Sequence, residues 1–335
     1  MTRIFAIETS CDETAAAIVD DGRDIVSSVV ATQAEIHAPF GGVVPEIASR
    51  AHLELINSVV AQALLEAATS LVDIDAFAAT HGPGLSGALL VGVSAAKALA
   101  LATGRPYVGV HHHEAHLFAA LLDDPSLEPP FMTLIVSGGH TMIIAADALG
   151  SYRVVGRTVD DAAGEAFDKV ARFCGLGYPG GPIIDRLSAT GDSTKARLPR
   201  PMLDDGCDFS FSGLKTAVIR LVRQQPDLEV RDVAAGFQTA VVDVLVTKLL
   251  RATIAEGMHT VVIGGGVAAN TQLRSVLAEA ARHAGLRAVI PDRALCTDNA
   301  AMVAAAAHHR LTTRGPSSLA DPVDPNLRID GRGDA

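Results

Sequence analysis

The chain has no tryptophan, and aromatic residues make up only 4% of its 335 residues. This shortage argues against the aromatic stacking surfaces that many single-strand nucleic-acid binders use. Charged residues reach 19%, below the usual value of about 25%, while apolar residues reach 49%. A disordered chain has the opposite balance, so we expect a sizeable core. Acidic residues outnumber basic ones by 38 to 27, and the net charge of −11 excludes binding to nucleic acid through overall charge.

Cysteine is also scarce, with four residues and no C-x-x-C pair. A disulfide framework or a thiolate zinc site needs closer or more numerous cysteines, so we expect reduced thiols. No apolar signal region precedes Glu8, and the apolar stretch 87–102 is interrupted by Lys97. We therefore expect a cytoplasmic protein in which 87–102 is a buried helix. The four cysteines are Cys11, Cys174, Cys207 and Cys296.

Two segments about 130 residues apart share one pattern. In each, a strand of β-branched residues enters a polar loop that ends in threonine, at Thr14 and Thr141, and a second and third strand follow. Such a repeat predicts two similarly built lobes. The predicted strands are 3–8, 15–20 and 25–31 in the first copy, and 131–136, 142–147 and 152–159 in the second.

Between and after these copies, helical patterns alternate with strands. A helix after Pro45 has an apolar stripe, and a long helix fits 230–255. The alternation predicts an α/β fold with mixed sheets. We expect an N-terminal lobe over 1–130, joined by a helix at 298–313, a C-terminal lobe over 131–313, and a loop or frayed tail over 314–335. The stripe is Ile47, Ala51, Leu55, Val59 and Ala63; the other predicted strands are 77–80, 107–110, 260–263 and 288–290, and further helices begin near 269 and 298.

The strongest chemical signal is the run His111-His112-His113-Glu114-Ala115-His116, at the point where a strand passes into a helix. His112 and His116 are four residues apart, so a helix places both imidazoles on one face. That spacing suits chelation of one divalent ion. The alternative is a polar surface cluster. The run is not the metalloprotease pattern, because Glu114 follows the wrong histidine.

A third ligand must come from another segment, and Asp298 is the best candidate. It precedes a predicted helix, so the alternative is a plain N-cap. Imidazole and carboxylate ligands with open positions suit iron or zinc better than magnesium.

Three glycine- or hydroxyl-rich loops favour binding of an anion. The loops at 9–14 and 137–141 occupy matching places in the repeat, and glycine amides with Ser or Thr hydroxyls suit a phosphate. The loop at 264–270 joins a strand to a helix N-terminus, which is a ready anion site. Simple turns and close packing are the alternatives. In the first loop, Asp12 and Glu13 read as solvated turn charges.

Acidic and basic clusters in the second half are less specific. Asp160 and Asp161 read as acids in a first helical turn, and 178–182 reads as a turn, with Asp185 just beyond it. A basic island over 195–223 is either ordinary surface or a contact to a phosphate backbone. It contains Lys195, Arg197, Arg200, Lys215, Arg220 and Arg223.

Ten motifs occur in order along the chain: IETSCDET, GGVVPEIASRAH, HGPGLSGALLVG, HHHEAH, VSGGHT, DDAAGEAFDK, YPGGP, FSFSGLKTA, GGGVAAN and CTDNAAM. Together they closely resemble the TsaD family, the transferase subunit that makes N6-threonylcarbamoyladenosine in tRNA, a family formerly labelled O-sialoglycoprotein endopeptidase. The resemblance covers roughly 3–310.

The resemblance implies an actin-like ATPase (ASKHA) fold of two RNase H-like lobes with mixed sheets and flanking helices. It implies threonylcarbamoyl-AMP as donor, bound between the lobes, and one divalent metal ion per chain, Fe²⁺ or else Zn²⁺. The implied metal ligands are His112, His116 and Asp298. The implied donor-binding residues are Ile135, Val136, Ser137, Gly138, Gly139, Asp168, Gly181, Asp185 and Asn270.

The implied reaction is acyl transfer to N6 of adenosine 37 in tRNAs that read codons beginning with A, with release of AMP. No residue stands out as a general base. The implied partners are a TsaB-like paralogue and a TsaE-like ATPase. Three alternative functions remain. An actin-like-fold kinase or ATPase would use Mg²⁺, which prefers oxygen ligands to the histidine pair. A metallopeptidase would need a glutamate placed to activate water, which this sequence lacks, and a pure scaffold would have degraded motifs, which this sequence does not have.

Overall fold

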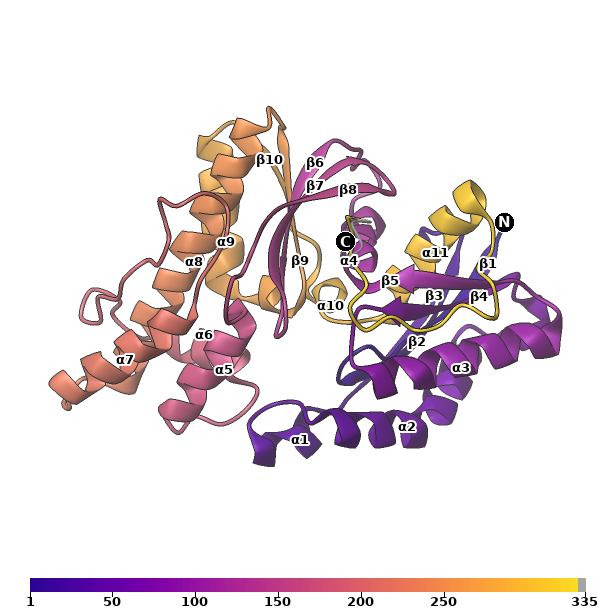
Figure 1. Cartoon of the computed structure of the whole chain (residues 1–335), viewed down its shortest axis with the longest axis horizontal. Helices are drawn as coiled ribbons and strands as arrows, with labels where there is room; N and C mark the ends of the chain where they lie inside the picture. The colour runs from indigo at the N-terminus through magenta and orange to yellow at the C-terminus, as the bar shows by residue number, and fades with distance from the viewer. Residues whose placement is uncertain (331–335) are drawn as a thin grey trace. The chain divides into compact units, whose positions relative to one another are not determined.

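The computed structural model describes residues 1–330. The chain divides into two compact units (Figure 1). Unit 1 is Met1–Leu127 together with the C-terminal segment that starts at Asp298, and unit 2 is Glu128–Thr297.

Unit 1 is built on a five-stranded mixed sheet with the order β3-β2-β1-β4-β5. β1 pairs antiparallel with β2 and parallel with β4, so the first strand lies at the centre. Every residue of β1 after Arg3 is buried, which explains why the strand reads as a continuous apolar run ending in Glu8. The strands are Arg3–Glu8 (β1), Glu13–Asp20 (β2), Asp24–Thr32 (β3), Ala76–Gly82 (β4) and Tyr107–His111 (β5).

Unit 2 repeats this topology. Its sheet has the order β10-β9-β6-β7-β8, in which β6 pairs antiparallel with β7 and parallel with β9. Strand for strand, this is the arrangement of unit 1, and it confirms the repeat predicted from the sequence. The strands are Phe131–Val136 (β6), Thr141–Ala148 (β7), Ser151–Arg157 (β8), Thr260–Gly264 (β9) and Arg287–Val289 (β10).

The buried face of helix α2 of unit 1 agrees with the predicted stripe at Val59 and Ala63 and differs from it in the first half of the helix. Ala51 and Leu55 are only half-buried, whereas His52 and Ile56 are buried. Burial of His52 shifts the stripe, because its ring nitrogens hydrogen bond to the Thr14 hydroxyl (2.8 Å) and the Cys11 carbonyl (3.0 Å). The helices are Ala34–His37 (α1), Ala38–Phe40 (η1), Pro45–Glu66 (α2), Leu71–Asp73 (η2), Ser86–Thr103 (α3), His112–Asp123 (α4) and Ala300–Arg314 (α11).

Helix α8 is the central helix of unit 2, with both its bounds as predicted. Phe237, Val241 and Leu245 are among its many fully buried side chains. It packs against α6, α9 and the strands β6 and β9. The helices of unit 2 are Ala163–Phe173 (α5), Gly180–Ser188 (α6), Ser212–Gln224 (α7), Val230–Ala255 (α8), Gly266–Ala269 (η3), Thr271–His283 (α9) and Arg293–Cys296 (α10).

Two local predictions in unit 2 are wrong. The turn expected over 178–182 ends early, because Gly180 already begins α6 and Asp185 lies within that helix. Asp160 does not enter the first turn of α5, which begins at Ala163. Its carboxylate instead accepts hydrogen bonds from the backbone N–H groups of Phe211 and Ser212 and so caps α7.

Two helices are long and apolar enough to cross a membrane by length and composition alone, a test that buried helices of soluble proteins also pass. In α8, 78% of the most apolar window is buried inside the protein, and burial accounts for its composition. In α3 the share is 33%, so the helix that was expected to be buried presents much of its surface outward.

The segment after α11 forms no further helix, yet it is held along unit 1 up to residue 330. Ser317 pairs with Tyr107 as an isolated bridge, and Lys97 donates to the Asp321 carbonyl. Asp324 N–H donates to the His81 carbonyl (2.8 Å). The part of the predicted tail that the structure describes is therefore an ordered loop and not a frayed end.

Packing around α8 gives a prediction on stability. A Cβ on Gly236 would collide with the backbone carbonyl of Ala196, so Gly236→Ala should destabilise the protein by about 1–3 kcal/mol. Gly213 in α7 is the control, since nothing lies within 4 Å of its Cβ position. Gly213→Ala should stabilise by about 0.5–1 kcal/mol through lower backbone entropy. Chemical denaturation measures both, and equal effects of the two variants would contradict this packing.

Candidate functional site

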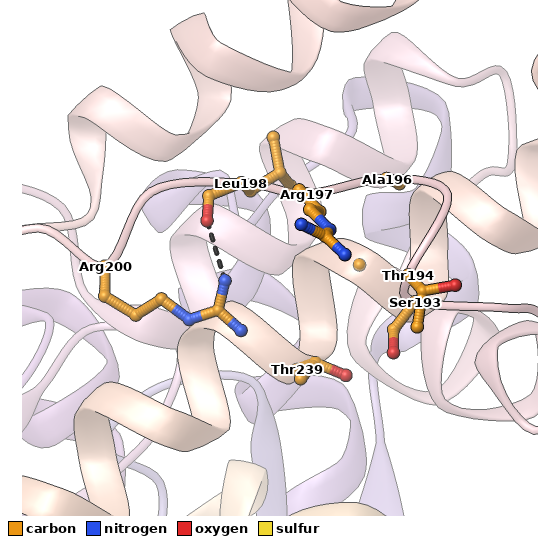
Figure 2. A pocket seen from close by; sticks show the side chains of 8 residues that line it. Ser193, Thr194, Ala196, Arg197, Leu198, Arg200 and Thr239 are labelled. Atoms are coloured by element: carbon orange, nitrogen blue, oxygen red, sulfur yellow. Dashed lines mark hydrogen bonds between the residues drawn. The ribbon is translucent and has the colours of Figure 1, made fainter.

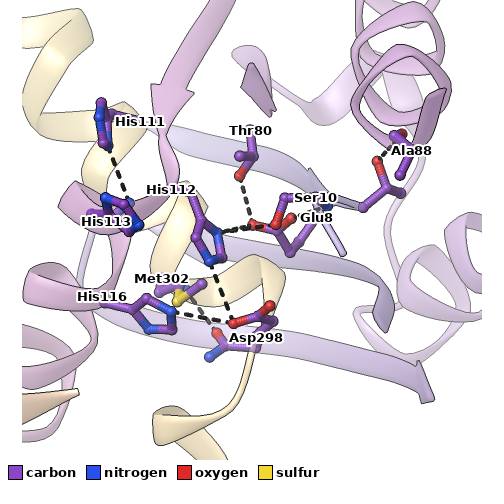
Figure 3. A network of polar contacts seen from close by, with 12 residues as sticks. Glu8, Ser10, Thr80, Ala88, His111, His112, His113, His116, Asp298 and Met302 are labelled. Carbon is purple, nitrogen blue, oxygen red and sulfur yellow. Dashed lines mark hydrogen bonds and ion pairs between the residues drawn. The ribbon is translucent and has the colours of Figure 1, made fainter. Parts of the chain in front are cut away.

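The two predicted imidazoles and the predicted carboxylate lie together in unit 1 (Figure 3). His112 begins α4 and His116 follows one turn later, with ring centroids 4.8 Å apart. Asp298 precedes α11, and its Oδ1 lies 3.6 Å from His112 Nε2 and 3.2 Å from His116 Nε2. The three ligand atoms are all within 4.8 Å of one another.

This cluster is chemically suited to a metal ion. His112 and His116 are 6% and 1% exposed, which excludes the alternative of a polar surface cluster. Within residues 1–330, neither ring nitrogen of His116 makes a hydrogen bond, although both are buried. Buried nitrogens without a hydrogen bond are costly, and a metal ion would satisfy one of them.

Asp298 is not needed as the cap of α11, because the next residue caps the helix. Asn299 Oδ1 accepts the Met302 N–H at 2.9 Å, so Asn299 is the N-cap of α11. The alternative of Asp298 as a plain N-cap is therefore wrong.

Glu8 supports His112 from behind. Its side chain has no exposed surface, and Oε2 lies 3.2 Å from His112 Nδ1. The Thr80 hydroxyl donates to the same oxygen (2.6 Å), and Ser10 N–H donates to Oε1 (2.5 Å). When a histidine binds a metal through one ring nitrogen, a carboxylate that hydrogen bonds to the other ring nitrogen fixes the orientation of the ring and raises its basicity; such carboxylates are common next to metal-binding histidines.

Electrostatics follow from this geometry. Burial alone would lower the pKa of His112, but the carboxylates of Asp298 and Glu8 raise it to about 9. Burial would raise the pKa of Glu8, and the neighbouring His112 outweighs it and lowers that pKa. At neutral pH the metal-free site therefore holds a proton on His112, and a metal ion must displace it.

The other two histidines of the run have different surroundings. His111 Nδ1 accepts the His113 N–H (3.1 Å) and so caps α4, while its Nε2 lies 3.2 Å from the Leu327 carbonyl. Burial lowers the pKa of His111 to about 3. The His113 ring packs beside those of His111 and His112, with centroids 5.3 and 5.8 Å away.

The loop between β1 and β2 turns its hydroxyls inward, which does not fit the phosphate prediction for it. The Thr9 hydroxyl donates to the Ala88 carbonyl, and the Ser10 hydroxyl faces His112 Nδ1 at 3.2 Å. Glu13 is not a solvated turn charge, because it begins β2 and is half-buried; burial and the carboxylate of Asp12 raise its pKa well above the usual value. The hydroxyls of this loop therefore contact other residues of the protein and do not face outward to a phosphate.

The matching loop of unit 2 is open. Gly138 and Gly139 are exposed, and a Cβ on either would meet nothing within 4 Å. Their N–H groups make no backbone hydrogen bond within residues 1–330. The N-terminus of α5 lies against this loop, since Gly164 N–H donates to the Ser137 carbonyl (3.1 Å). Free amides next to a helix N-terminus form a site for an anion.

The glycine loop after β9 lies beside it, because Ile135 and Gly264 are partners in the parallel β6–β9 pair. Gly265 has φ +90° and packs on Val136, where a Cβ would collide with the backbone carbonyl. This glycine is required by packing. Ile135 and Val136 are fully buried in β6, and they lead directly into the open loop.

The remaining predicted donor-binding residues lie on α5, α6 and before α9. The Asp168 carboxylate accepts the Gly180 N–H at 2.7 Å and so fixes the start of α6. Gly181 has open space at its Cβ position. Asp185 Oδ2 accepts the N–H and hydroxyl of Thr271 (3.1 and 2.9 Å), which follows Asn270.

The basic island contains paired and unpaired cations. Lys195 bonds to Asp232 (3.0 Å), and Arg200 bonds to Asp243 (2.6 Å). Arg197 is exposed and has no ion pair or side-chain hydrogen bond within the described residues. It borders a polar hollow of about 390 Å³ with Arg200 and the hydroxyls of Ser193, Thr194 and Thr239 (Figure 2).

Comparison with known proteins now identifies the family. The family model described as TsaD, tRNA N6-adenosine threonylcarbamoyltransferase, matches residues 24–305. The chain belongs to the TsaD family. Among curated relatives that carry this name, the Trichlorobacter lovleyi protein is 53% identical over 322 residues, covering 95% of this chain and 94% of the relative. The Thermosynechococcus vestitus protein is 54% identical, with the same shares covered.

Solved structures place the fold. Component A of the (R)-2-hydroxyglutaryl-CoA dehydratase of Acidaminococcus fermentans has a TM-score of 0.59 at 16% identity, covering 93% of this chain and 100% of that chain. HypF of T. kodakarensis has a TM-score of 0.63 at 12% identity, covering 94% and 48%. These confirm the actin-like ATPase fold predicted for this TsaD-family chain.

Two residues of these sites were missed by sequence reasoning. Glu8 ends a buried strand, and Gln238 is a polar residue amid the apolar positions of α8. A polar side chain in a buried run was the available signal for both, since such a group needs a partner.

The support of His112 by Glu8 gives a prediction on metal affinity. Glu8→Gln removes the negative charge behind the imidazole, so affinity for Fe²⁺ or Zn²⁺ should fall about 10- to 100-fold. The control Glu46→Gln removes an exposed carboxylate that pairs with Arg50 on α2, and it should leave affinity unchanged. Competition with a chromophoric chelator measures both. Full metal content in a His112→Ala/His116→Ala variant would contradict the ligand assignment itself.

Proposed function

We propose that this TsaD-family protein transfers the threonylcarbamoyl group from threonylcarbamoyl-AMP to N6 of adenosine 37 in tRNAs that read codons beginning with A. The N6–C bond forms, the bond from the carbamoyl carbon to the phosphate oxygen breaks, and AMP leaves while N6 loses a proton. The observation that carries the proposal is the match, over nearly the whole chain, to curated proteins named tRNA N6-adenosine threonylcarbamoyltransferase.

In this proposal the open loop of unit 2 binds the phosphate of the adenylate. The exposed amides of Gly138 and Gly139 and the N-terminus of α5 would hold its negative charge, and the same charge grows on the leaving AMP. Ser137 keeps the loop in shape, since its N–H donates to the His140 carbonyl (2.8 Å). Asp168, Gly181, Asp185 and Asn270 would line the nucleoside part.

We further propose that His112, His116 and Asp298 hold one divalent metal ion. Two imidazoles and one carboxylate with open positions are the ligand set of non-haem Fe²⁺ sites, so Fe²⁺ is our first assignment and Zn²⁺ the second. Such an ion supplies positive charge to the oxygens of a bound substrate. Glu8 keeps His112 oriented, and we assign no residue as general base.

The open surface of α2 and α3 supports a role for protein partners. Leu53 on α2 and Leu90 on α3 are 62% and 52% exposed. We propose that a TsaB-like paralogue and a TsaE-like ATPase assist this cytoplasmic enzyme, because a chain of net charge −11 has little affinity of its own for tRNA.

The reaction gives a direct test. Incubated with tRNA, threonine, bicarbonate, ATP, an adenylate-forming enzyme and both partner proteins, the chain should produce N6-threonylcarbamoyladenosine, detected by mass spectrometry of the nucleosides. Omission of either partner should abolish multiple turnover, and the His112→Ala/His116→Ala variant is the inactive control. No product in the complete mixture would refute the transferase assignment, and efficient turnover by the chain alone at physiological salt would refute the partner requirement.

Arg197, an unpaired cation of the basic island, gives a test for the tRNA contact. Arg197→Gln should weaken tRNA binding several-fold and reduce the slope of log affinity against log salt by about one, as expected for the loss of one phosphate contact. The control Arg153→Gln removes a cation outside the island that is paired with Asp147 and Glu256. If the two variants have the same tRNA affinity and salt slope, the island is ordinary surface.

A further inference from the structure

Gln238 lies at the centre of a row of polar side chains in unit 2. It is 2% exposed, on the buried face of α8, yet it contacts side chains from two other segments. Its Oε1 accepts from Asn270 Nδ2 at 2.7 Å, and its Nε2 lies 3.1 Å from Asp185 Oδ1. Gln238 therefore joins two residues that we propose for nucleotide binding, from α6 and from the start of α9.

A backbone hydrogen bond fixes which side-chain atoms of this row donate and which accept. Asn270 is the N-cap of α9, and its Oδ1 accepts the Leu273 N–H at 2.9 Å. Its Nδ2 must then face Gln238, which in turn must present its own oxygen to Asn270 and its nitrogen to Asp185. A flip of either amide would place two donors or two acceptors in contact.

The far end of the row is equally constrained. Asp185 Oδ1 accepts from Gln238, and Oδ2 accepts from the N–H and hydroxyl of Thr271. Both carboxylate oxygens need donors, so the residue at 238 must donate. The Gln238 nitrogen also lies 2.8 Å from Ser188 Oγ and 3.1 Å from Gln272 Oε1, which fixes its position.

We propose that Gln238 is the positioning residue of the nucleoside site. It orders Asp185 as an acceptor and Asn270 as a donor, and leaves a lone pair on Asp185 Oδ1 and a second hydrogen on Asn270 Nδ2 for a ligand. One acceptor next to one donor matches the vicinal hydroxyls of a ribose. This inference rests on the proposed function, because it takes Asp185 and Asn270 as ligand-binding residues.

A negative charge introduced at position 238 should break the hydrogen bonds that join Asn270, Gln238 and Asp185. The elements packed on this part of α8 are α6 and α9. From α6 comes Asp185, and Arg274 of α9 turns its guanidinium to the Ala268 carbonyl (3.3 Å). Arg293 of α10 donates to the Ala269 carbonyl (3.2 Å) and to the Thr271 hydroxyl (3.1 Å). A carboxylate introduced at 238 would thus face the Asp185 carboxylate, and burial together with this like charge would raise its pKa.

AMP binding to the full chain tests the proposal. At pH 8, Gln238→Glu should bind AMP at least 10-fold more weakly than the wild type. At pH 5.5 the introduced carboxyl is protonated and donates again, so Gln238→Glu should bind AMP less than about 3-fold more weakly than the wild type at the same pH. Gln225→Glu, an exposed position after α7, adds the same charge and should match the wild type at both pH values.

A second variant exchanges the carboxylate and the amide between positions 185 and 238 and so restores the hydrogen bond between them. Asp185→Asn alone leaves either Thr271 or Gln238 without an acceptor and should weaken AMP binding. The double variant Asp185→Asn/Gln238→Glu has the wild-type net charge and again pairs one donor with one acceptor, so at pH 8 it should bind AMP at least 3-fold more tightly than Asp185→Asn, while the lost carboxylate oxygen keeps it weaker than the wild type. This rescue also serves if Gln238→Glu by itself does not fold.

The failures are distinguishable. If the wild type binds AMP, and Gln238→Glu binds it equally well at pH 8 or the double variant binds no better than Asp185→Asn, then the positioning role is wrong and the nucleotide site stands. If the wild type does not bind AMP, the proposed nucleotide site fails, and this inference fails with it.

Discussion

A carboxylate with no exposed surface must be surrounded by donors, and Glu8 organises unit 1 around this requirement. Its two oxygens bring together the loop after β1, strand β4 through Thr80 and helix α4 through His112. Together with Asp298, the same charge raises the pKa of His112 to about 9 in the absence of a metal. One buried charge at the end of the central strand therefore holds these three segments together.

The two units use one topology for different purposes. In unit 1 the loop after the central strand turns its hydroxyls inward, Thr9 to the Ala88 carbonyl and Ser10 to His112. In unit 2 the matching loop has two exposed glycines whose N–H groups make no backbone hydrogen bond within residues 1–330. The repeat supplies the same position at the end of a central strand, and the side chains at that position decide whether it supports a metal ligand or offers an anion site.

Much of the fold could be predicted because its signals are local. The matching strand patterns predict the repeat, the apolar run predicts both ends of α8, and the four-residue spacing predicts that the two histidines share a helix face. The buried face of α2 could not be predicted from apolar residues, because His52 is buried by two hydrogen bonds to residues about 40 positions away in sequence. The same holds for Asp160, which caps a helix that starts some fifty residues later, and for Gln238, whose partners come from separate helices.

The ordered segment after α11 has a consequence for how the protein behaves in solution. β5 is the last strand of its sheet, and an uncovered edge strand offers free backbone groups to a neighbouring molecule. Ser317 pairs with Tyr107 on that edge, and its hydroxyl accepts the Gly109 N–H at 2.9 Å. The C-terminal segment thus closes the edge of the sheet. A chain cut directly after α11 would keep every residue of the histidine cluster and yet expose a strand that favours aggregation.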